Sequence, residues 1–531
     1  MRKNKSLPSE TIDFGKYEIA SKGQLKAPRQ NGTWASTWST APGDVAQLLV
    51  GRSRKGARES WLQTVVTPGP NRVAPICPHF ARCGGCAWQH LTYPAQLELK
   101  TAPLAQALRE LGGPEFELLP PCPSPKPWHY RSKIELSFLN DDLGFNRRGC
   151  YGRIVPVTEC FIGPSANREI IAITRAWFKR HGLSCWDTKS NTGMLRYLII
   201  RQSSFDQGVL VALVCSPDCP DAALQELSQE LADLPAVRGF VQAVQTSVAS
   251  AVVVDEVRVL YGENHLQERL GELKFELNFQ SFFQSNPPAF ANMLRTITGW
   301  LPVNGHLLDL YCGVGTIGLT LALHSGCSLT GVESVAPAVK DAQANAERAG
   351  IKADFHCGNS EDWPDLNCDV LVLDPPRSGC HPKMISRLLT EGPERVLYIS
   401  CNPKRFLEEF QTLKEAYRLE RAQMFDFFPQ TPHVETCVLL GLKDVDEYIY
   451  IDYEPDHHIK RGRATYREVK EYVLKNYGLK VSSLDIAQIK DKCGFEKRDN
   501  YNKGKEGHRV PICTPEKEDA IMEAFKHFNM I

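Results

Sequence analysis

The sequence has no apolar run long enough to cross a membrane. A membrane-spanning helix needs about 20 apolar residues, whereas the longest runs, such as residues 209–215, match buried strands. The chain begins with the polar stretch Met1-Arg-Lys-Asn-Lys-Ser, so a secretory signal is not expected either. Internal repeats and long low-complexity tracts are also missing. These absences predict a cytoplasmic protein of several ordinary globular domains.

The chain also lacks net charge, with 62 Lys and Arg against 62 Asp and Glu among 531 residues. A neutral average argues weakly against a nucleic-acid partner. The charge is unevenly distributed, however, because residues 1–76 hold 12 Lys and Arg against 5 Asp and Glu, and residues 457–531 hold 16 against 11. Two basic ends fit a polyanion of the size of RNA better than a small metabolite. The alternative is a solvated surface with mobile arms.

Disulfides are not expected, although the sequence has 18 cysteines, because thiols stay reduced in the cytosol. Cys77, Cys83 and Cys86 lie close together, and this density indicates a metal site. Thiolates in groups of four bind either zinc or an iron–sulfur cluster, and the spacing does not decide between them. The alternative without a metal is a redox pair in Cys-Gly-Gly-Cys. The fourth ligand that we predict is Cys160, with Cys122 and Cys150 as rivals.

Four segments of the chain differ in their sequence pattern. Residues 1–76 carry short β-type runs between Gly, Pro, Ser and Thr, which predicts a small β-barrel after a disordered start of about 15 residues. Residues 77–280 carry the cysteine cluster in a predicted α+β domain. Residues 281–442 repeat strand, loop and helix, which predicts a parallel, doubly wound α/β sheet. Residues 443–531 contain three amphipathic stretches that predict a small helical module.

The expected elements follow from apolar runs and their periods. In the second segment, helices are predicted at 97–111, 167–180 and 221–234, and strands at 134–138, 197–201, 209–215 and 251–254. In the third segment, strands are predicted at 307–311, 328–333, 370–373, 396–399 and 435–440. In the fourth segment, helices are predicted to begin after Thr465, Ser482 or Ser483, and Thr514.

A glycine-rich loop follows the strand predicted at 307–311. The run Gly313-Val-Gly-Thr-Ile-Gly318 has the GxGxxG spacing that lets the backbone approach a nucleoside-bearing cofactor. Glu333 lies about 20 residues further on, where an acid accepts hydrogen bonds from ribose hydroxyls. Both NAD and S-adenosylmethionine need these features. The preceding Asp309-Leu-Tyr-Cys resembles a methyltransferase loop more closely than a dehydrogenase loop.

Three further residues stand next to predicted strands. The turn Asp374-Pro-Pro-Arg377 ends a strand and directs Asp374 at a cofactor or base. Cys401 lies just past another strand and before Asn402-Pro403, at the start of a helix, where a thiol has its pKa lowered and is poised as a thiolate. Glu435 begins the next strand. A thiolate that attacks carbon 6 of a pyrimidine activates carbon 5 for methylation, and a base such as Glu435 then removes the carbon 5 proton.

At this point the sequence resembles the RNA 5-methyluridine methyltransferases, and in particular the iron–sulfur-containing bacterial enzymes that modify 23S ribosomal RNA. The run from Cys77 to Tyr93, with Cys-Gly-Gly-Cys inside it, is similar to the family's cluster motif, and Phe282-Phe-Gln-Ser-Asn286 is similar to its motif at the entry to the catalytic domain. The likeness covers residues 30–442. Residues 1–76 resemble the family's TRAM domain only loosely, and residues 443–531 are an appendage outside the basic family architecture.

The resemblance implies a Rossmann-like fold, S-adenosylmethionine as cofactor and uracil-5 methylation of 23S ribosomal RNA. It implies a 4Fe–4S cluster on Cys77, Cys83, Cys86 and Cys160. It implies that Cys401 is the nucleophile and Glu435 the proton acceptor. The implied cofactor contacts are Gln284, Tyr311, Glu333 and Asp374. Residues Tyr130, Arg131 and Lys133 are candidate RNA contacts.

Several other functions fit part of the sequence. A tRNA uracil-5 methyltransferase shares the catalytic motifs. An RNA cytosine-5 methyltransferase is disfavoured, because those enzymes usually carry Pro-Cys where this chain has Asp374-Pro-Pro-Arg377. An NAD-dependent oxidoreductase leaves Cys401 and Glu435 unexplained. A metal-containing RNA-binding protein without catalysis predicts that Cys401→Ala keeps every activity. The oligomeric state cannot be read from the sequence.

Overall fold

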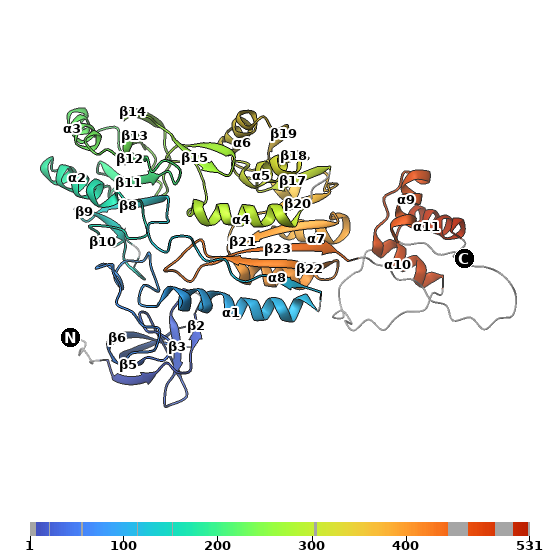
Figure 1. The fold of residues 1–531 in the computed structure, drawn as a ribbon, viewed down its shortest axis with the longest axis horizontal. Helices are drawn as coiled ribbons and strands as arrows, with labels where there is room; N and C mark the ends of the chain where they lie inside the picture. Colours follow the sequence, from blue (N-terminus) through green and yellow to red (C-terminus); the bar gives the residue numbers. More distant parts are fainter. Residues whose placement is uncertain are drawn as a thin grey trace.

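The computed structural model describes residues 7–20, 22–54, 57–113, 115–150, 152–301, 305–443, 466–493 and 513–528. Figure 1 shows four groups of elements: an N-terminal sheet, a second sheet with two helices, a large sheet covered by helices, and three C-terminal helices. Within the described ranges, no helix has the length and apolar character needed to traverse a bilayer.

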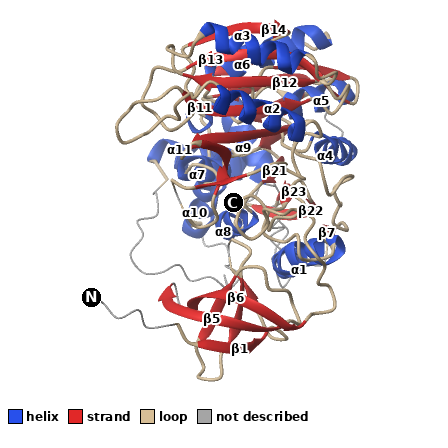
Figure 2. Ribbon diagram, turned by 90° about the vertical axis from the view of Figure 1, so that its left-hand side faces the viewer, coloured by secondary structure: helices blue, strands red, loops and turns tan. Residues whose placement is uncertain are grey.

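The N-terminal strands form one curled six-stranded sheet, seen at the bottom of Figure 2. Its strands are β1 (Ser9–Asp13), β2 (Glu18–Ile19), β3 (Leu25–Pro28), β4 (Trp34–Thr37), β5 (Val45–Arg54) and β6 (Ala57–Thr67), in the order β1-β5-β6-β4-β3-β2. β1 lies against β3 as well as β5, which curls the sheet around a small apolar core. The predicted disorder of the first 15 residues is wrong for β1, because Ile12 is buried in this core.

The second sheet has seven strands in the order β10-β9-β8-β11-β12-β13-β14. They are β8 (Lys133–Leu139), β9 (Asp142–Asn146), β10 (Ile154–Pro156), β11 (Leu195–Gln202), β12 (Val209–Cys215), β13 (Val237–Val244) and β14 (Glu256–Gly262). Helices α2 (Asn167–Arg180) and α3 (Asp221–Ala232) pack on one face through an apolar cluster. The strand predicted at 251–254 is wrong, because Val252 and Val254 pack on the other face as a loop before β14.

The large sheet has eight strands in the order β19-β18-β17-β20-β21-β23-β22-β7. They are β7 (Glu117–Leu118), β17 (His306–Leu310), β18 (Ser328–Glu333), β19 (Ala353–Cys357), β20 (Val370–Leu373), β21 (Arg395–Ser400), β22 (Tyr417–Phe425) and β23 (Glu435–Leu442). The predicted strands β17, β18, β20 and β21 are parallel, and β19, which the sequence pattern did not predict, pairs parallel with β18. The expectation of a wholly parallel sheet is wrong, because β23 turns back from β22 and runs antiparallel to both of its neighbours.

Helices cover both faces of the large sheet (Figure 1). One apolar cluster joins it to α4 (Pro287–Trp300), α5 (Thr316–Ser325), α6 (Ala336–Ala349) and the hairpin of β15 (Leu266–Leu270) and β16 (Leu273–Leu277). The other cluster joins it to α1 (Tyr93–Gly112), α7 (Pro382–Glu391) and α8 (Pro403–Leu413). A 3-10 turn, η1 (Ser360–Asp362), follows β19.

Helix α1 lies against the large sheet rather than the second one. Leu104 and Leu108 belong to the same core as β20 and β21, and β7 extends the sheet beside β22. The domain boundaries at 76, 280 and 442 stay predictions. The packing of α1 and β7 nevertheless connects the segment that follows the cysteine cluster directly to the sheet that carries Cys401.

The three C-terminal helices form a small bundle of their own. They are α9 (Tyr466–Tyr477), α10 (Ser483–Lys492) and α11 (Pro515–His527), joined by a core that includes Val469, Ile489 and Ile521. The predicted helices after Ser482 and Thr514 are confirmed. Thr465, predicted to cap the first helix, lies outside the described residues.

Candidate active site

The glycine loop connects β17 to α5 at the edge of the large sheet where the parallel strands end. Tyr311, Gly313 and Gly315 have positive φ angles of 64°, 56° and 79°, a conformation that favours glycine. A Cβ atom at Gly315 would lie 2.9 Å from the Phe355 ring, whereas one at Gly313 would meet no atom within 4 Å. The loop is therefore tightly packed below and open above Gly313, which leaves room for a ligand against its backbone.

Two carboxyl groups flank this loop. Asp309 is fully buried, and its Oδ2 accepts a hydrogen bond of 2.9 Å from Gly318 N. Burial, with smaller contributions from the Asp374 and Glu333 charges, raises the pKa of Asp309 to about 8. Glu333 ends β18 and accepts hydrogen bonds from Gly313 N at 3.1 Å and Val335 N at 2.9 Å. Glu333 therefore stands at the strand end where the motif predicts a ribose acceptor.

The strand pairing brings Cys401, Glu435 and Asp374 together. β21 pairs with β23 up to Ser400 and Thr436 in antiparallel register, so the next pair of positions is Cys401 and Glu435. On the other side of β21, the parallel neighbour β20 ends just before Asp374. The three side chains are close enough that the Glu435 and Asp374 charges act on the thiol.

The segments that carry Asp374 and Cys401 are also tied to each other. Asn402 Nδ2 donates a hydrogen bond of 2.9 Å to the Arg377 carbonyl, which links the turn after β20 to the start of α8. Deeper in the core, the Tyr398 hydroxyl donates to Glu409 Oε2 at 2.6 Å, which links β21 to α8. Cys401 is therefore held from both the strand before it and the helix after it.

The predicted lowering of the Cys401 pKa is wrong for the structure without bound substrate. The pKa of Cys401 is raised to about 11, chiefly by burial and then by the charges of Glu435 and Asp374, while the Arg377 guanidinium lowers it by less. A helix N-terminus supplies only about half an elementary charge, which two carboxylates outweigh. The thiol is therefore protonated at neutral pH until something removes its proton.

The two carboxyl groups beside the thiol also favour their protonated forms. Burial raises the pKa of Glu435 well above its usual range, and the Asp374 charge adds to this. Burial raises the pKa of Asp374 to about 7. Asp374 therefore binds a proton near neutral pH, and raised carboxyl pKa values of this kind are typical of groups that act as general bases.

The structure distributes the predicted cofactor contacts over one edge of the sheet. Tyr311 and Asp374 directly follow β17 and β20, and Glu333 is the last residue of the neighbouring strand β18. Gln284 lies in the loop between β16 and α4, half-buried, and Asn286 two residues later caps α4 through a bond of 3.2 Å to Ala289 N. The role of each of these four residues as a cofactor contact stays a prediction.

The four predicted cluster cysteines line one cavity of about 310 Å³. The rivals Cys122 and Cys150 do not line this cavity. Burial raises the pKa of Cys86 to about 12 and that of Cys160 to about 11, with smaller contributions from the neighbouring cysteines. Among the residues that the structure describes, no three His, Cys, Asp or Glu side chains are gathered tightly enough to hold a metal ion.

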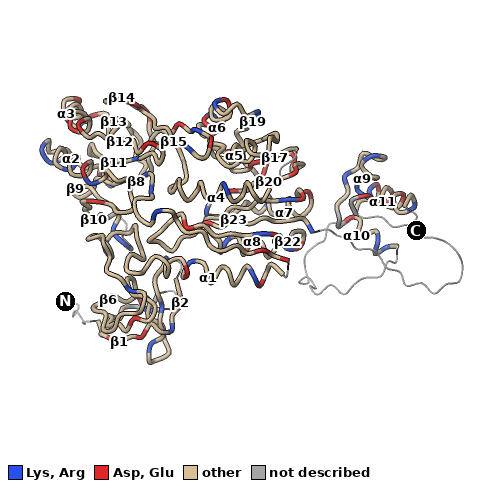
Figure 3. Tube along the Cα trace, in the orientation of Figure 1, with Lys and Arg blue, Asp and Glu red and all other residues tan. Residues whose placement is uncertain are grey.

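Of the three candidate RNA contacts, Tyr130 is wrong because it is an internal residue, and Arg131 and Lys133 stay predictions. Tyr130 is buried, and its hydroxyl donates a hydrogen bond of 3.0 Å to the Pro429 carbonyl, so it is an internal contact. Arg131 and Lys133 line the cysteine cavity, and burial lowers the pKa of Lys133 to about 8. Along the described chain, Lys and Arg are interspersed with Asp and Glu (Figure 3).

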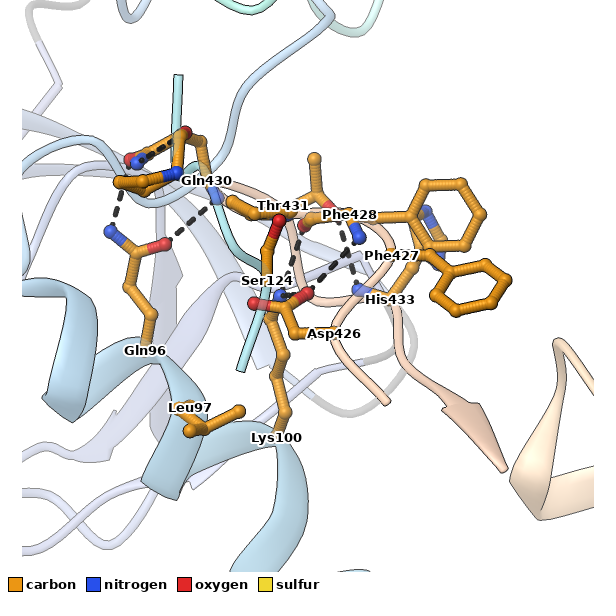
Figure 4. A network of polar contacts seen from close by, with 12 residues as sticks. Gln96, Leu97, Lys100, Ser124, Asp426, Phe427, Phe428, Gln430, Thr431 and His433 are labelled. Carbon is orange, nitrogen blue, oxygen red and sulfur yellow. Dashed lines mark hydrogen bonds and ion pairs between the residues drawn. The ribbon is translucent and has the colours of Figure 1, made fainter. Parts of the chain in front are cut away.

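Sequence reasoning missed the buried polar network around residues 426–434 (Figure 4). Its centre is the ion pair between Lys100 Nζ and Asp426 Oδ1, which are 2.6 Å apart with both side chains fully buried. The available signal was Gln96 and Lys100, two polar residues one turn apart on the face of α1 that also carries Leu104 and Leu108.

Two family models match the part of the chain that carries this site. The model described as tRNA (Uracil-5-)-methyltransferase matches residues 352–443, and the one described as methyltransferase small domain matches residues 290–397. A protein named uncharacterized RNA methyltransferase, from Nitratidesulfovibrio vulgaris, is 33% identical over 432 residues, which is 77% of this chain and 91% of that protein. A tRNA (uracil(54)-C(5))-methyltransferase from Pyrococcus furiosus is 31% identical over 400 residues, which is 75% and 92%.

A solved structure is similar over most of the chain. It is the tRNA (uracil-54, C5)-methyltransferase of Pyrococcus abyssi in complex with S-adenosyl-L-homocysteine, with a TM-score of 0.65 and 28% identity. The match covers 82% of this chain and 100% of that one.

A glycine loop at the end of the first parallel strand and a cysteine beside two carboxyl groups define an α/β methyltransferase. The length and identity of the matches make the assignment more specific. The chain belongs to the RNA uracil-5 methyltransferase family, whose members are S-adenosylmethionine-dependent enzymes.

Proposed function

We propose that this enzyme methylates carbon 5 of a uridine in folded RNA through a covalent adduct between Cys401 and the uracil ring. The observation that carries the proposal is the register of β21 and β23, which puts a thiol opposite a buried carboxyl group. A nucleophile and a base on neighbouring strand ends can act on the two adjacent carbons of one ring. The target base is flipped out or taken from a loop, because carbon 6 is inaccessible in a stack.

The reaction divides into an attack and a release. The Asp374 carboxylate beside Cys401 takes the thiol proton, and the sulfur bonds to carbon 6. The electrons of the carbon 5–carbon 6 double bond then move toward the ring carbonyl to form an enolate. When bound, S-adenosylmethionine supplies the electrophilic methyl group that carbon 5 takes. Glu435 then removes the proton from carbon 5, the double bond forms again, and the carbon–sulfur bond breaks with its electron pair returning to Cys401.

The proposed cofactor contacts are Gln284, Tyr311, Glu333 and Asp374. The open space above Gly313 and the carboxylate of Glu333 beside the loop fit a nucleoside. Proline residues after Asp374 stiffen the turn that directs its carboxyl group toward the same edge. The presence of S-adenosyl-L-homocysteine in the similar Pyrococcus abyssi enzyme supports this assignment.

We also propose that Cys77, Cys83, Cys86 and Cys160 hold a 4Fe–4S cluster. All four line one cavity, which suits a group larger than a single ion. A tetrahedral zinc site instead needs all four sulfur atoms about 2.3 Å from one point, and no such tight group occurs in the described part of the chain. The cluster would be structural, ordering the segment between the N-terminal sheet and α1.

The proposed substrate is 23S ribosomal RNA, as the cluster motif predicts. Position 54 of tRNA is a second candidate, since two similar proteins carry that activity in their names. The test incubates unmodified transcripts of both RNAs with labelled S-adenosylmethionine and either the wild type or Cys401→Ala, followed by nucleoside mass spectrometry. 5-Methyluridine in one RNA with the wild type alone supports the reaction and identifies the substrate. Its absence from both RNAs with cluster-loaded enzyme contradicts the proposal.

A further inference from the structure

Glu435, the proposed base, directly follows a loop that lies outside the strand pairing of the large sheet. Residues 426–434, which we name the base loop, connect β22 to β23, and the pairing resumes with Phe425 opposite Glu435. Hairpin connections usually have about two to five residues, so a loop of this length has many conformations open to it. The contacts that fix the base loop therefore also decide how Glu435 enters the site.

The first anchor comes from helix α1. Lys100 Nζ lies 2.6 Å from Asp426 Oδ1 and donates a second hydrogen bond of 2.9 Å to the Phe428 carbonyl. Asp426 Oδ1 also accepts Phe428 N at 3.0 Å, so one carboxylate oxygen joins the loop backbone to the lysine. Burial lowers the pKa of Lys100, and the Asp426 charge opposes this. A buried ion of either kind is stable only when it is paired.

The second anchor is at the tip of the loop, also in Figure 4. Gln430 has a φ angle of 69°, a strained value for a residue with a side chain. Gln96 of α1 makes two hydrogen bonds to Gln430. Its Nε2 donates to Gln430 Oε1 at 3.0 Å, and its Oε1 accepts from Gln430 N at 2.8 Å. The Gln430 carbonyl accepts from Ala87 N at 2.8 Å and Trp88 N at 3.0 Å.

Two more contacts attach the loop to other parts of the chain. The Tyr130 hydroxyl donates to the Pro429 carbonyl at 3.0 Å, and Asn286 Nδ2 donates to the Phe427 carbonyl at 3.1 Å. The loop backbone is thus bonded by α1, by the segment after Cys86 and by the residues that open the catalytic domain. Only the ion pair contributes full charges to this arrangement.

We propose that Lys100 and Asp426 are positioning residues that set the location of Glu435 for proton removal from carbon 5. This inference rests on the proposed function. Neither residue contacts the segment that carries Cys401, which lies between β21 and α8 and is held through Tyr398 and Asn402 instead. Loss of the ion pair therefore slows release of the methylated uridine while the attack and methyl transfer continue.

This separation gives a signature that a merely structural role would not produce. After methyl transfer, carbon 5 carries both a methyl group and a proton, and the carbon 6–sulfur bond persists until a base removes that proton. A displaced Glu435 leaves this enzyme–RNA complex intact and stable to denaturing electrophoresis. A misplacement of about 1 Å costs on the order of 100-fold in rate, so a tenfold slower release is readily reached.

The test uses the full-length enzyme with whichever RNA it methylates. The variant Lys100→Met/Asp426→Asn removes both charges at similar size, which avoids leaving one buried ion unpaired. Glu435→Gln serves as the reference for a lost base. The matched control is Arg175→Met/Asp142→Asn, which removes an ion pair of 2.8 Å between α2 and β9. The measurements are 5-methyluridine turnover, the Michaelis constant for RNA, and the fraction of enzyme in the denaturation-stable complex.

The expected result for the Lys100 and Asp426 variant is turnover reduced at least about tenfold, a Michaelis constant for RNA that does not rise, and a complex that accumulates as with Glu435→Gln. Unchanged turnover, or reduced turnover without accumulation, overturns the positioning role. If Glu435→Gln itself accumulates no complex, the assignment of the base fails instead. Should the double variant not fold, Gln96→Leu replaces it, because this change removes the side-chain hydrogen bonds to Gln430 without altering any charge. Reduced turnover with accumulation of the complex then supports the positioning of Glu435 by α1, and unchanged turnover or no accumulation overturns it.

Discussion

The protonation of Cys401 in the free enzyme can be measured directly. Its thiol has a pKa raised from an ordinary value of 9.0 to about 11, so at pH 7 about one molecule in 10,000 carries the thiolate, against about one in 100 for an ordinary thiol. Only the thiolate reacts with iodoacetamide. The alkylation rate of Cys401 should therefore rise about tenfold for each pH unit from 7 to 10.

The assay follows the peptide that contains Cys401 by mass spectrometry, which distinguishes it from the other cysteines. Asp374→Asn removes one of the two neighbouring charges and should shift the profile to lower pH, whereas Glu347→Gln, on the exposed face of α6, should leave it unchanged. A plateau below pH 9, or identical profiles for the wild type and Asp374→Asn, would refute the reasoning that burial and carboxylates outweigh the helix N-terminus.

Three further predictions concern the glycine loop and the cysteines. Burial raises the pKa of Asp309 to about 8, so between pH 4 and pH 8 this carboxyl ionises in the unfolded state only, and the wild type loses stability as the pH rises. In urea unfolding, Asp309→Asn should therefore gain about 2 kcal/mol of stability relative to the wild type between pH 6 and pH 8. A difference between the two that does not change with pH would contradict this. Gly315→Ala should lower the free energy of unfolding by about 1–2 kcal/mol, because residue 315 has a left-handed backbone, and should weaken S-adenosylmethionine binding measured by calorimetry. Gly350→Ala, with open space around its Cβ, should lower stability without changing this binding. Cys86→Ser should lose bound iron and its visible absorbance while Cys150→Ser keeps both, and equal iron contents would contradict the cluster assignment.

The sequence predicts five of the eight strands of the large sheet, β17, β18, β20, β21 and β23, and misses β7, β19 and β22. Residues 370–373 and 396–399 are short apolar runs between turn residues, and the structure has β20 and β21 at these positions. The direction of β23 has no such local signal, since the same residues could pair in either orientation. The strand predicted at 251–254 is absent for the opposite reason, because Val252 and Val254 partly bury their side chains without pairing their backbone.

The candidate site is only partly accessible to sequence reasoning. The order of the glycine loop, Asp374, Cys401 and Glu435 along the chain points to one edge of a sheet, and the pairing of β20, β21 and β23 puts the last three together. The pKa of Cys401 depends on which charges surround it in space, so the helix position alone gave the wrong sign. The partners Lys100 and Asp426 lie more than 300 residues apart, and no local pattern relates them.

The covalent bond to Cys401 is the central claim, and RNA with 5-fluorouridine at the target position tests it most directly. Fluorine at carbon 5 cannot leave as a proton does, so release should stop after methyl transfer. With S-adenosylmethionine present, the account predicts a denaturation-stable complex whose digestion gives one peptide, with a methylated fluorouridine attached to Cys401. A complex through another cysteine, or no complex with an RNA whose ordinary uridine the enzyme methylates, would contradict it.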